Sequence, residues 1–91
     1  MTPVATYYKI DGERVAQRMN EARERLLNED GEAVLDFSEV LRIDTGALLA
    51  IEELANAAEQ KSLRVVLRKA NVSVYKVLKL SRLTARFIFV G

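Results

Sequence analysis

Hydrophobic and polar residues change from one spacing to another along the first part of this chain. Residues 4–10 are rich in β-branched and aromatic side chains and predict a strand, which ends at an Asp-Gly pair. Residues 13–28 place apolar side chains on one helical stripe, with charged residues around the rest. They predict an amphipathic helix that covers one face of a sheet and ends in a left-handed cap at Asn28 or Gly31.

The central stretch, residues 32–58, predicts a strand followed by a helix. Residues 33–37 are a short apolar run without a helical period, which is typical of a buried strand. After a polar turn, Asp44-Thr45-Gly46 precedes apolar residues at helical spacing, so Asp44 is the predicted N-cap. In an open α/β sheet, ligands and modifications commonly lie where the end of a strand meets the start of a helix.

The last third of the chain predicts a strand, a helix and a second strand. Residues 63–68 have an apolar interior and predict an inner strand. Residues 72–80 predict a short helix, with Asn71 or Ser73 as its cap. Residues 87–90 predict a short terminal strand.

Together these elements predict a single α/β domain that spans residues 1–91. Their order is β-α-β-α-β-α-β, and right-handed crossovers give a four-stranded, mostly parallel sheet with helices packed on it. The first and last strands carry aromatic and β-branched residues. Because such strands pair readily when they lie at a sheet edge, a homodimer through an edge strand is a further expectation.

The composition excludes several kinds of chemistry. The 91 residues include neither Cys nor His, which excludes a thiol nucleophile, a disulfide, the usual zinc site and an imidazole base. The carboxylates Asp36 and Asp44 have no third ligand in view, so we predict no metal, cofactor or catalytic residue. No apolar segment is long enough to cross a bilayer and no leader opens the chain, so we expect a cytoplasmic protein without membrane insertion.

Acidic and basic residues are unevenly distributed. All 13 acidic residues lie at or before Glu59, whereas only basic charges follow from Lys61 onward. This basic end can steer an acidic partner, or the two halves can neutralise each other across one compact fold. The sequence has no aromatic RNA-binding motif and no Gly-rich phosphate loop. Nucleic acid is therefore not the expected partner, and a nucleotide- or small-ligand-binding module remains only a further alternative.

The order of these motifs resembles the STAS domain of bacterial anti-sigma factor antagonists. The resemblance covers residues 6–90 and is most specific where Ile43-Asp44-Thr45 enters an apolar helix after a strand. The stretches that carry it are Val34-Leu35-Asp36-Phe37-Ser38, residues 42–48, residues 63–67, residues 77–83 and Phe87. The chain is thereby identified as a divergent and shortened member of that family.

The resemblance implies a non-catalytic regulatory module that binds an anti-sigma-type or switch-kinase partner. The partner surface that it implies comprises Asp36, Ser38, Asp44, Thr45, Gly46, Ala47, Leu48 and Ile51. In the family, the phosphorylated hydroxyl is commonly the second residue after the Asp of the motif, which is Gly46 here. Thr45 is the hydroxyl that remains, and it is the candidate phosphoacceptor. A phosphate on Thr45 would be repelled by Asp44 and Asp36 and would release the partner.

Departures from the family pattern leave other interpretations open. Arg82 replaces the family's Gly after the last helix, the N-terminal hairpin is shortened to one strand, and no helix follows residues 87–90, whereas many family members have one there. With Gly46 at the acceptor position, the chain could also be a phosphorylation-silent scaffold subunit of a lipid or anion transporter, or of a stressosome-like complex. Asp44 and Asp36 could also serve only as a helix cap and a turn former.

Overall fold

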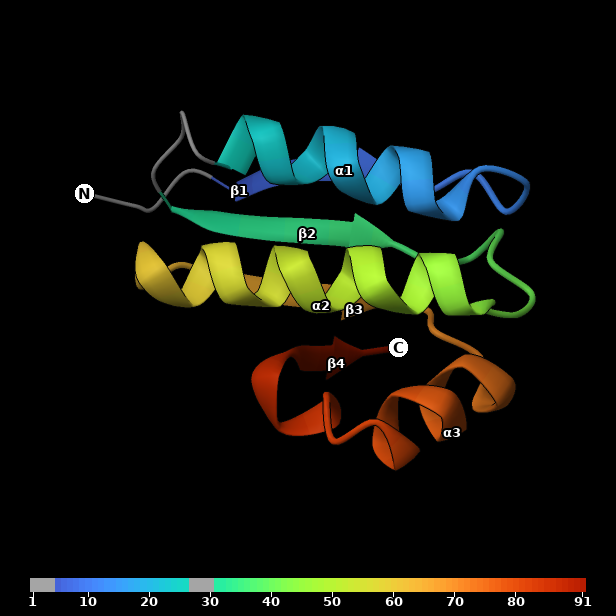
Figure 1. Ribbon diagram of the computed structural model, residues 1–91. Helices are drawn as coiled ribbons and strands as arrows, with labels where there is room; N and C mark the ends of the chain where they lie inside the picture. Colours follow the sequence, from blue (N-terminus) through green and yellow to red (C-terminus); the bar gives the residue numbers. More distant parts are fainter. Residues whose placement is uncertain (1–4, 27–30) are drawn as a thin grey trace.

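The computed structural model describes residues 5–26 and 31–91 of the chain (Figure 1). Its elements are β1 (Ala5–Lys9), α1 (Val15–Leu26), β2 (Glu32–Asp36), α2 (Thr45–Gln60), β3 (Arg64–Arg68), α3 (Val72–Leu80), the 3-10 helix η1 (Thr84–Arg86) and β4 (Ile88–Val90). The predicted order of strands and helices is confirmed. The predicted cap residue Asn28 lies outside the described residues, whereas Gly31 has a φ of 110°, a left-handed value that suits glycine.

The four strands form one sheet in the order β1-β2-β3-β4, and each neighbouring pair is parallel. Each helix connects one strand to the neighbouring strand of the sheet, so the strands lie in the sheet in the same order as in the sequence (Figure 1). β3 is an inner strand, as its apolar interior predicts, and β1 and β4 are the edges. Because all strands are parallel, the loops that follow them open onto the same end of the sheet.

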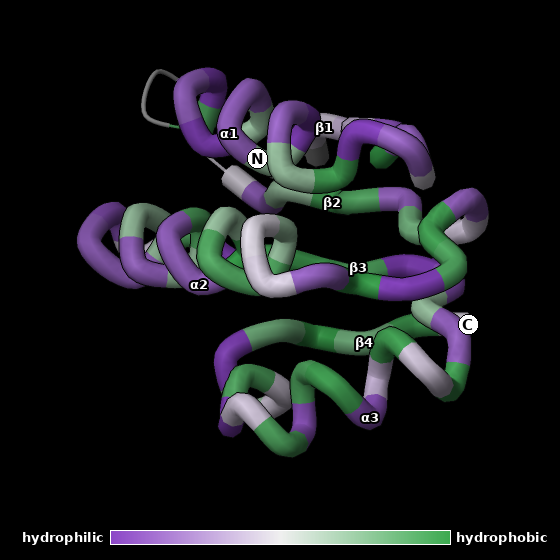
Figure 2. The backbone as a smooth tube through the Cα atoms, turned by 45° about the vertical axis from the view of Figure 1, so that its right-hand side comes forward, coloured by the Kyte–Doolittle hydropathy of each residue, from purple (hydrophilic) through white to green (hydrophobic). Residues whose placement is uncertain are grey.

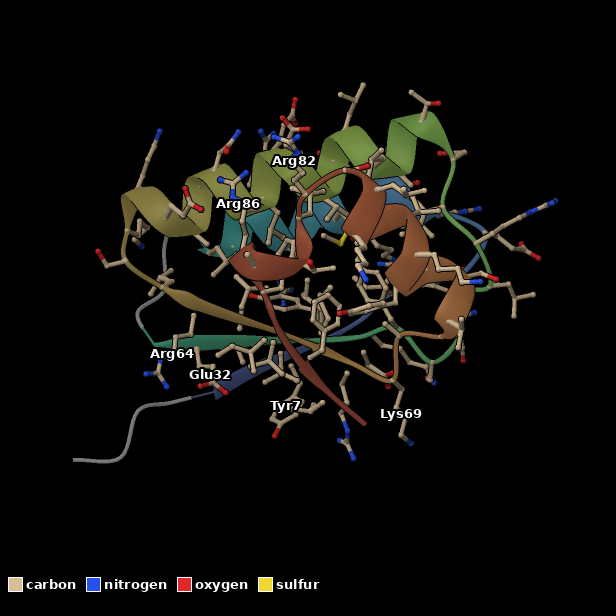
Figure 3. All side chains as sticks on the ribbon, turned by 90° about the horizontal axis from the view of Figure 1, so that it is seen from below. Tyr7, Glu32, Arg64, Lys69, Arg82 and Arg86 are labelled. Carbon is tan, nitrogen blue, oxygen red and sulfur yellow. The ribbon has the colours of Figure 1, made fainter. Side chains whose placement is uncertain are left out.

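The helices α1, α2 and α3 lie on one face of the sheet. α1 and α2 run side by side across it, and α3 lies near β4 on the same side (Figures 1 and 3). The strand residues that alternate toward the helices, Ala33 and Leu35 in β2 and Val65 and Leu67 in β3, belong to the hydrophobic core. No described helix covers the opposite face, which we call the open face; Tyr7 points away from the helices there (Figure 3).

The core is filled from the helices by residues at helical spacing. The buried residues are Val15, Met19, Ala22 and Leu26 in α1, and Ala47, Ala50, Ile51, Leu54, Ala55 and Ala58 in α2. Burying one large apolar side chain contributes about 1.5–3 kcal/mol, so these stripes hold both helices on the sheet. Hydrophobic residues run along the inner strands, whereas hydrophilic residues predominate on α1 (Figure 2). No helix in the described residues is both long and apolar enough to span a membrane.

α2 and α3 end in the same way, each with a left-handed residue that is not glycine. After α2, Ser62 has a φ of 55°, and the Leu63 N–H donates back into the last turn at 2.9 Å. After α3, Arg82 has a φ of 59°, and the Leu83 N–H donates to the Leu78 carbonyl oxygen at 2.8 Å. These are the hydrogen bonds of a Schellman motif, whose left-handed position favours glycine. Arg82 therefore adopts a glycine conformation where the sequence departs from the family pattern.

The basic residues of the last third lie on two sides of the molecule and do not form one patch. Arg64 and Lys69 lie on the side of the open face, whereas Arg82 and Arg86 lie on the side of the helices (Figure 3). There, Arg86 Nε donates to Glu59 Oε1 at 2.6 Å. For Arg86, the interpretation that the acidic and basic halves neutralise each other therefore holds.

Candidate functional site

The candidate site lies at the N-terminus of α2, where Asp44 caps the helix. Asp44 Oδ1 accepts a hydrogen bond from the Ala47 N–H at 2.7 Å, and the Asp44 carbonyl oxygen accepts one from the Leu48 N–H at 2.9 Å. The Asp44 backbone is extended, at φ −89° and ψ 178°, which is the usual conformation of an N-cap. The predicted cap is confirmed, and Thr45 is the first helical residue.

The first turn of α2 faces solvent. Asp44, Thr45 and Gly46 are all exposed residues. A Cβ added to Gly46 would meet only the side chain of Asp44, at an ordinary contact distance of 3.6 Å. The fold therefore does not require glycine at this position, and a serine would fit there.

Two residues of the predicted partner surface, Ala47 and Ile51, are buried. Ala47 is 3% exposed and Ile51 is fully buried, because both lie on the stripe of α2 that faces the sheet. Leu48 is only half-buried, and Leu49 is 57% exposed. Leu49 follows Thr45 by one helical turn, so the two side chains are neighbours on the helix surface. The sequence signal for this difference was helical spacing: Ala47 and Ile51 are four residues apart and share the buried stripe, whereas Leu49 lies between them on another side of the helix.

The loop between β2 and α2 is fixed by contacts at its start and its middle. The Ser38 N–H donates to Asp36 Oδ1 at 2.9 Å, and Val40 is buried in the core. The β1–α1 loop approaches so closely that a Cβ on Gly12 would overlap the backbone carbonyl oxygen of Glu39. Glycine at this position allows the two loops to touch.

Asn71 joins this loop to the start of α3. Its Oδ1 accepts the Val74 N–H at 2.8 Å, while its Nδ2 donates to the carbonyl oxygens of Val40 and Leu41, each at 3.1 Å. Asn71, rather than Ser73, is therefore the cap of α3. The same contacts keep the exposed side chain of Leu41, at 77%, near the end of the sheet where α2 begins.

A groove of about 690 Å³ lies between the start of α1 and the start of α2. It is lined by residues 12–17, residues 42–44 and Ala47, so Arg14 and Arg42 line the same groove as the cap residue Asp44. Neither arginine stood out in the sequence. The signal that could have found them is the parallel sheet, which gathers the loops after β1 and β2 at one edge. The groove is lined by both acidic and basic residues, which suit contact with a polar protein surface better than binding of an apolar ligand.

Asp36 points away from this groove. It alternates with core residues of β2 and therefore faces the open face of the sheet. Hydrogen bonds from Ser38 lower the pKa of the Asp36 carboxyl, and the charges of Lys9 and Lys69 lower it further. Asp44 instead begins the helix that covers the other face, so the two carboxylates do not face the same side of the sheet, and the expected repulsion of a Thr45 phosphate rests on Asp44.

The site combines polar, charged and apolar groups. They are an exposed hydroxyl, a cap carboxylate, two guanidinium groups and exposed leucine side chains. Within residues 5–26 and 31–91, no group of three acidic side chains lies close enough to hold a metal ion.

Comparisons with known proteins bear on the fold and the family. A protein-family model described as "Mlab, STAS domain" matches residues 9–90 of the chain. Solved structures with the same fold include the crystal structure of TM1081 from Thermotoga maritima, named as a candidate anti-sigma factor antagonist. It has a TM-score of 0.77 at 20% sequence identity, over 99% of this chain and 83% of that chain. The NMR structure of TM1081 has a TM-score of 0.77 at 18% identity, over 96% of this chain and 74% of that chain. No curated protein sequence matches the chain significantly.

Proposed function

The chain belongs to the STAS domain family, and on this premise we propose that it is a non-catalytic regulatory module that binds another protein. The partner in this proposal is an anti-sigma-type or switch-kinase protein, and the complex forms in the cytoplasm. The observation that carries the proposal is the exposed turn Asp44-Thr45-Gly46, which adjoins a leucine that is 57% exposed, Leu49. Exposed apolar side chains beside polar groups are typical of protein-binding sites.

We define the docking surface as Leu41, Asp44, Thr45, Gly46 and Leu49. The two leucines, 77% and 57% exposed, would supply apolar contacts, and the cap carboxylate and the hydroxyl would supply polar ones. The hydrogen bonds from Asn71 to the preceding loop limit the freedom of this surface before binding. A surface fixed in advance loses less conformational entropy on association, which favours affinity.

Phosphorylation of Thr45 would act as a release signal in this proposal. A phosphoryl group adds nearly two negative charges beside the Asp44 carboxylate, which changes the charge that a partner meets. The N-terminus of α2 would partly stabilise the phosphate, and so would Arg14 and Arg42, which line the groove beside the cap residue Asp44, if their side chains turn toward it. The modified state would therefore be stable but no longer complementary to the partner.

Binding to a purified anti-sigma-type kinase, measured by titration calorimetry, tests the docking surface. We expect Leu49→Ala to weaken binding at least about tenfold, as truncating a central apolar contact does. Leu80→Ala is the matched control, since Leu80 is 86% exposed but lies at the far end of α3. Both variants should keep the unfolding midpoint of the wild type. Wild-type affinity in Leu49→Ala together with lost affinity in Leu80→Ala would place the partner elsewhere.

Incubation with the kinase and ATP, followed by mass spectrometry, tests the phosphorylation step. We expect a gain of about 80 Da in the wild type, the mass of one phosphoryl group, and no gain in Thr45→Ala. A gain that persists in Thr45→Ala would assign the modification to another hydroxyl.

A second candidate function is a phosphorylation-silent scaffold subunit of a transporter or of a stressosome-like complex. Gly46 favours it, since the fold leaves room for a hydroxyl at this position and the chain carries none. Gly46→Ser separates the two functions. A phosphoryl gain in Gly46→Ser but not in the wild type would support a scaffold that has lost its switch.

A further inference from the structure

The open face of the sheet carries an ordered array of side chains. Because the strands pair in register, these side chains form three rows across the face. The first row holds Glu32 and Arg64, the second Tyr7, Val34, Val66 and Ile88, and the third Lys9, Asp36, Arg68 and Val90. An apolar row is thus bordered on both sides by charged rows, and acidic and basic residues occupy neighbouring strands.

The apolar row is exposed at its ends and shielded in its middle. Tyr7 is 68% exposed and Ile88 is 42% exposed, on the two edge strands. Val34 and Val66 are each only 6% exposed, yet they do not belong to the core between the sheet and the helices. They are therefore apolar residues of the open face that lie outside the core between the sheet and the helices.

We propose that the open face binds the open face of a second copy of this chain. The two sheets are related by a two-fold axis that runs parallel to the strands, midway between β2 and β3. This axis places β2 over β3 of the partner subunit and keeps each row opposite the same row. Val34 then faces the partner's Val66, and Tyr7 faces the partner's Ile88, as in an aligned packing of two sheets.

The charged rows are self-complementary under the same axis. Glu32 faces the partner's Arg64, and Asp36 faces the partner's Arg68. Because a two-fold interface repeats each contact, both pairs occur twice. The apolar contacts and the charge contacts therefore select the same arrangement.

The alternative two-fold axis, perpendicular to the strands, brings like charges together. It would reverse the row order, so Glu32 would face the partner's Asp36 and Arg64 would face the partner's Arg68. Like charges opposed across an interface are a common way for a protein to exclude a competing arrangement. The order of charges along β2 and β3 thus discriminates between the two ways to stack the sheets.

The charges needed for this contact are available. The ion pairs within the described parts of the chain are Lys9–Glu39, Arg18–Glu21, Arg23–Glu53 and Arg86–Glu59. None of them uses Glu32, Arg64 or Arg68. Lys9, the remaining cation of the third row, is already bound to Glu39 of its own chain at 3.0 Å and adds little repulsion.

The size of the face predicts a weak, concentration-dependent dimer. Its strands have only three to five residues and lie about 4.8 Å apart, so the face is smaller than the roughly 800 Å² per partner of a standard interface. The docking surface lies at the start of α2, on the helix side, and stays accessible in the dimer. A dimer would present two docking surfaces to one assembly and would bind it with higher avidity.

Sedimentation equilibrium from about 10 µM to about 1 mM, a range that includes weak dimers, tests this proposal. We expect a monomer–dimer equilibrium in the wild type and at least tenfold weaker association in Tyr7→Lys and in Glu32→Arg. The double variant Glu32→Arg with Arg64→Glu restores each reciprocal pair with reversed sign and should associate like the wild type. Glu52→Arg, the same charge change on exposed α2, is the control that should not weaken association.

Each other outcome overturns the proposal. A wild-type chain that stays monomeric at about 1 mM excludes a dimer of this strength. Stronger association in Glu32→Arg would indicate the perpendicular axis, where the introduced guanidinium group would meet the partner's Asp36. Unchanged association in both Tyr7→Lys and Glu32→Arg would indicate pairing through an edge strand, since Glu32 lies on an inner one. Unfolding midpoints like that of the wild type show that the variants are folded.

Discussion

Asn71 and Val40, 31 residues apart in the chain, are joined by a hydrogen bond of 3.1 Å from the side-chain amide to the main-chain carbonyl oxygen. The other end of the same amide accepts the Val74 N–H at 2.8 Å. One side chain thus caps α3 and fixes the loop that leads into α2. Since the two roles use different atoms, substitutions can separate them.

Asn71→Ala removes both roles, and we expect it to lower the free energy of unfolding by about 1–2 kcal/mol. Asn71→Asp keeps the cap acceptor but removes the amide donor. We therefore expect it to retain most of the helix stability while the amides of Leu41 and Arg42 exchange faster with deuterium. Equal exchange in the wild type and Asn71→Asp would mean that the donor does not hold the loop.

Gly12→Ala and Gly46→Ala are a matched pair near the candidate site. At Gly12 the new methyl group would overlap the Glu39 carbonyl oxygen, so one loop must move, at a cost of about 1–3 kcal/mol. At Gly46 there is room, and alanine in a helix is favoured over glycine by about 0.5–1 kcal/mol. Urea unfolding should therefore shift in opposite directions. A shift in the same direction would contradict the close contact of the loops.

Arg82→Gly should stabilise the protein, because Arg82 holds a left-handed conformation, with φ of 59°. That conformation costs a residue with a side chain roughly 1–2 kcal/mol, and glycine avoids this cost. Glycine also makes the unfolded chain more flexible, which cancels part of the gain in stability. We expect a net gain of about 0.5–1 kcal/mol and a rise of a few degrees in Tm.

Lys79→Gly is the control for this change, since it removes a positive charge from the same helix at a helical position. It should destabilise by about 1 kcal/mol. A fall in Tm for Arg82→Gly would mean that the arginine side chain stabilises the helix end by more than its backbone strain costs.

The ion pair between Glu59 and Arg86 predicts a pH dependence of stability. The hydrogen bond from Arg86 lowers the pKa of the Glu59 carboxyl below its ordinary value of 4.5. The folded state therefore favours the ionised form of Glu59. The ion pair contributes fully to the free energy of unfolding above about pH 4.5, and this contribution is lost as the pH falls through the lowered pKa.

We expect the urea midpoint of Glu59→Gln to lie below that of the wild type at pH 7 and to approach it as the pH falls below about 4. The difference should be small and should shrink in high salt, since Glu59 is largely exposed. In Arg86→Gln, the further change Glu59→Gln should have little effect. A difference in urea midpoint between the wild type and Glu59→Gln that stays constant from pH 7 to pH 3 would contradict the lowered pKa of Glu59.

The sequence by itself determined the features that depend on local spacing. The range of α3, residues 72–80, was predicted in full, and Asp44 was predicted as the cap of α2. Helical periodicity and capping involve residues within about one turn of each other, so they can be read without knowing the rest of the fold. The mostly parallel direction of the strands followed, because a helix between two strands leaves few other topologies.

Tertiary structure decided which of the predicted site residues meet solvent and which meet each other. It buried Ile51, turned Asp36 to the open face, and joined Asn71 to a loop 31 residues away. Each of these depends on how one element is rotated against another or on which strands are neighbours. The charge rows of the open face have the same origin, since Glu32 and Arg64 become neighbours only through strand register. Contacts between residues far apart in sequence come from packing, which no local pattern encodes.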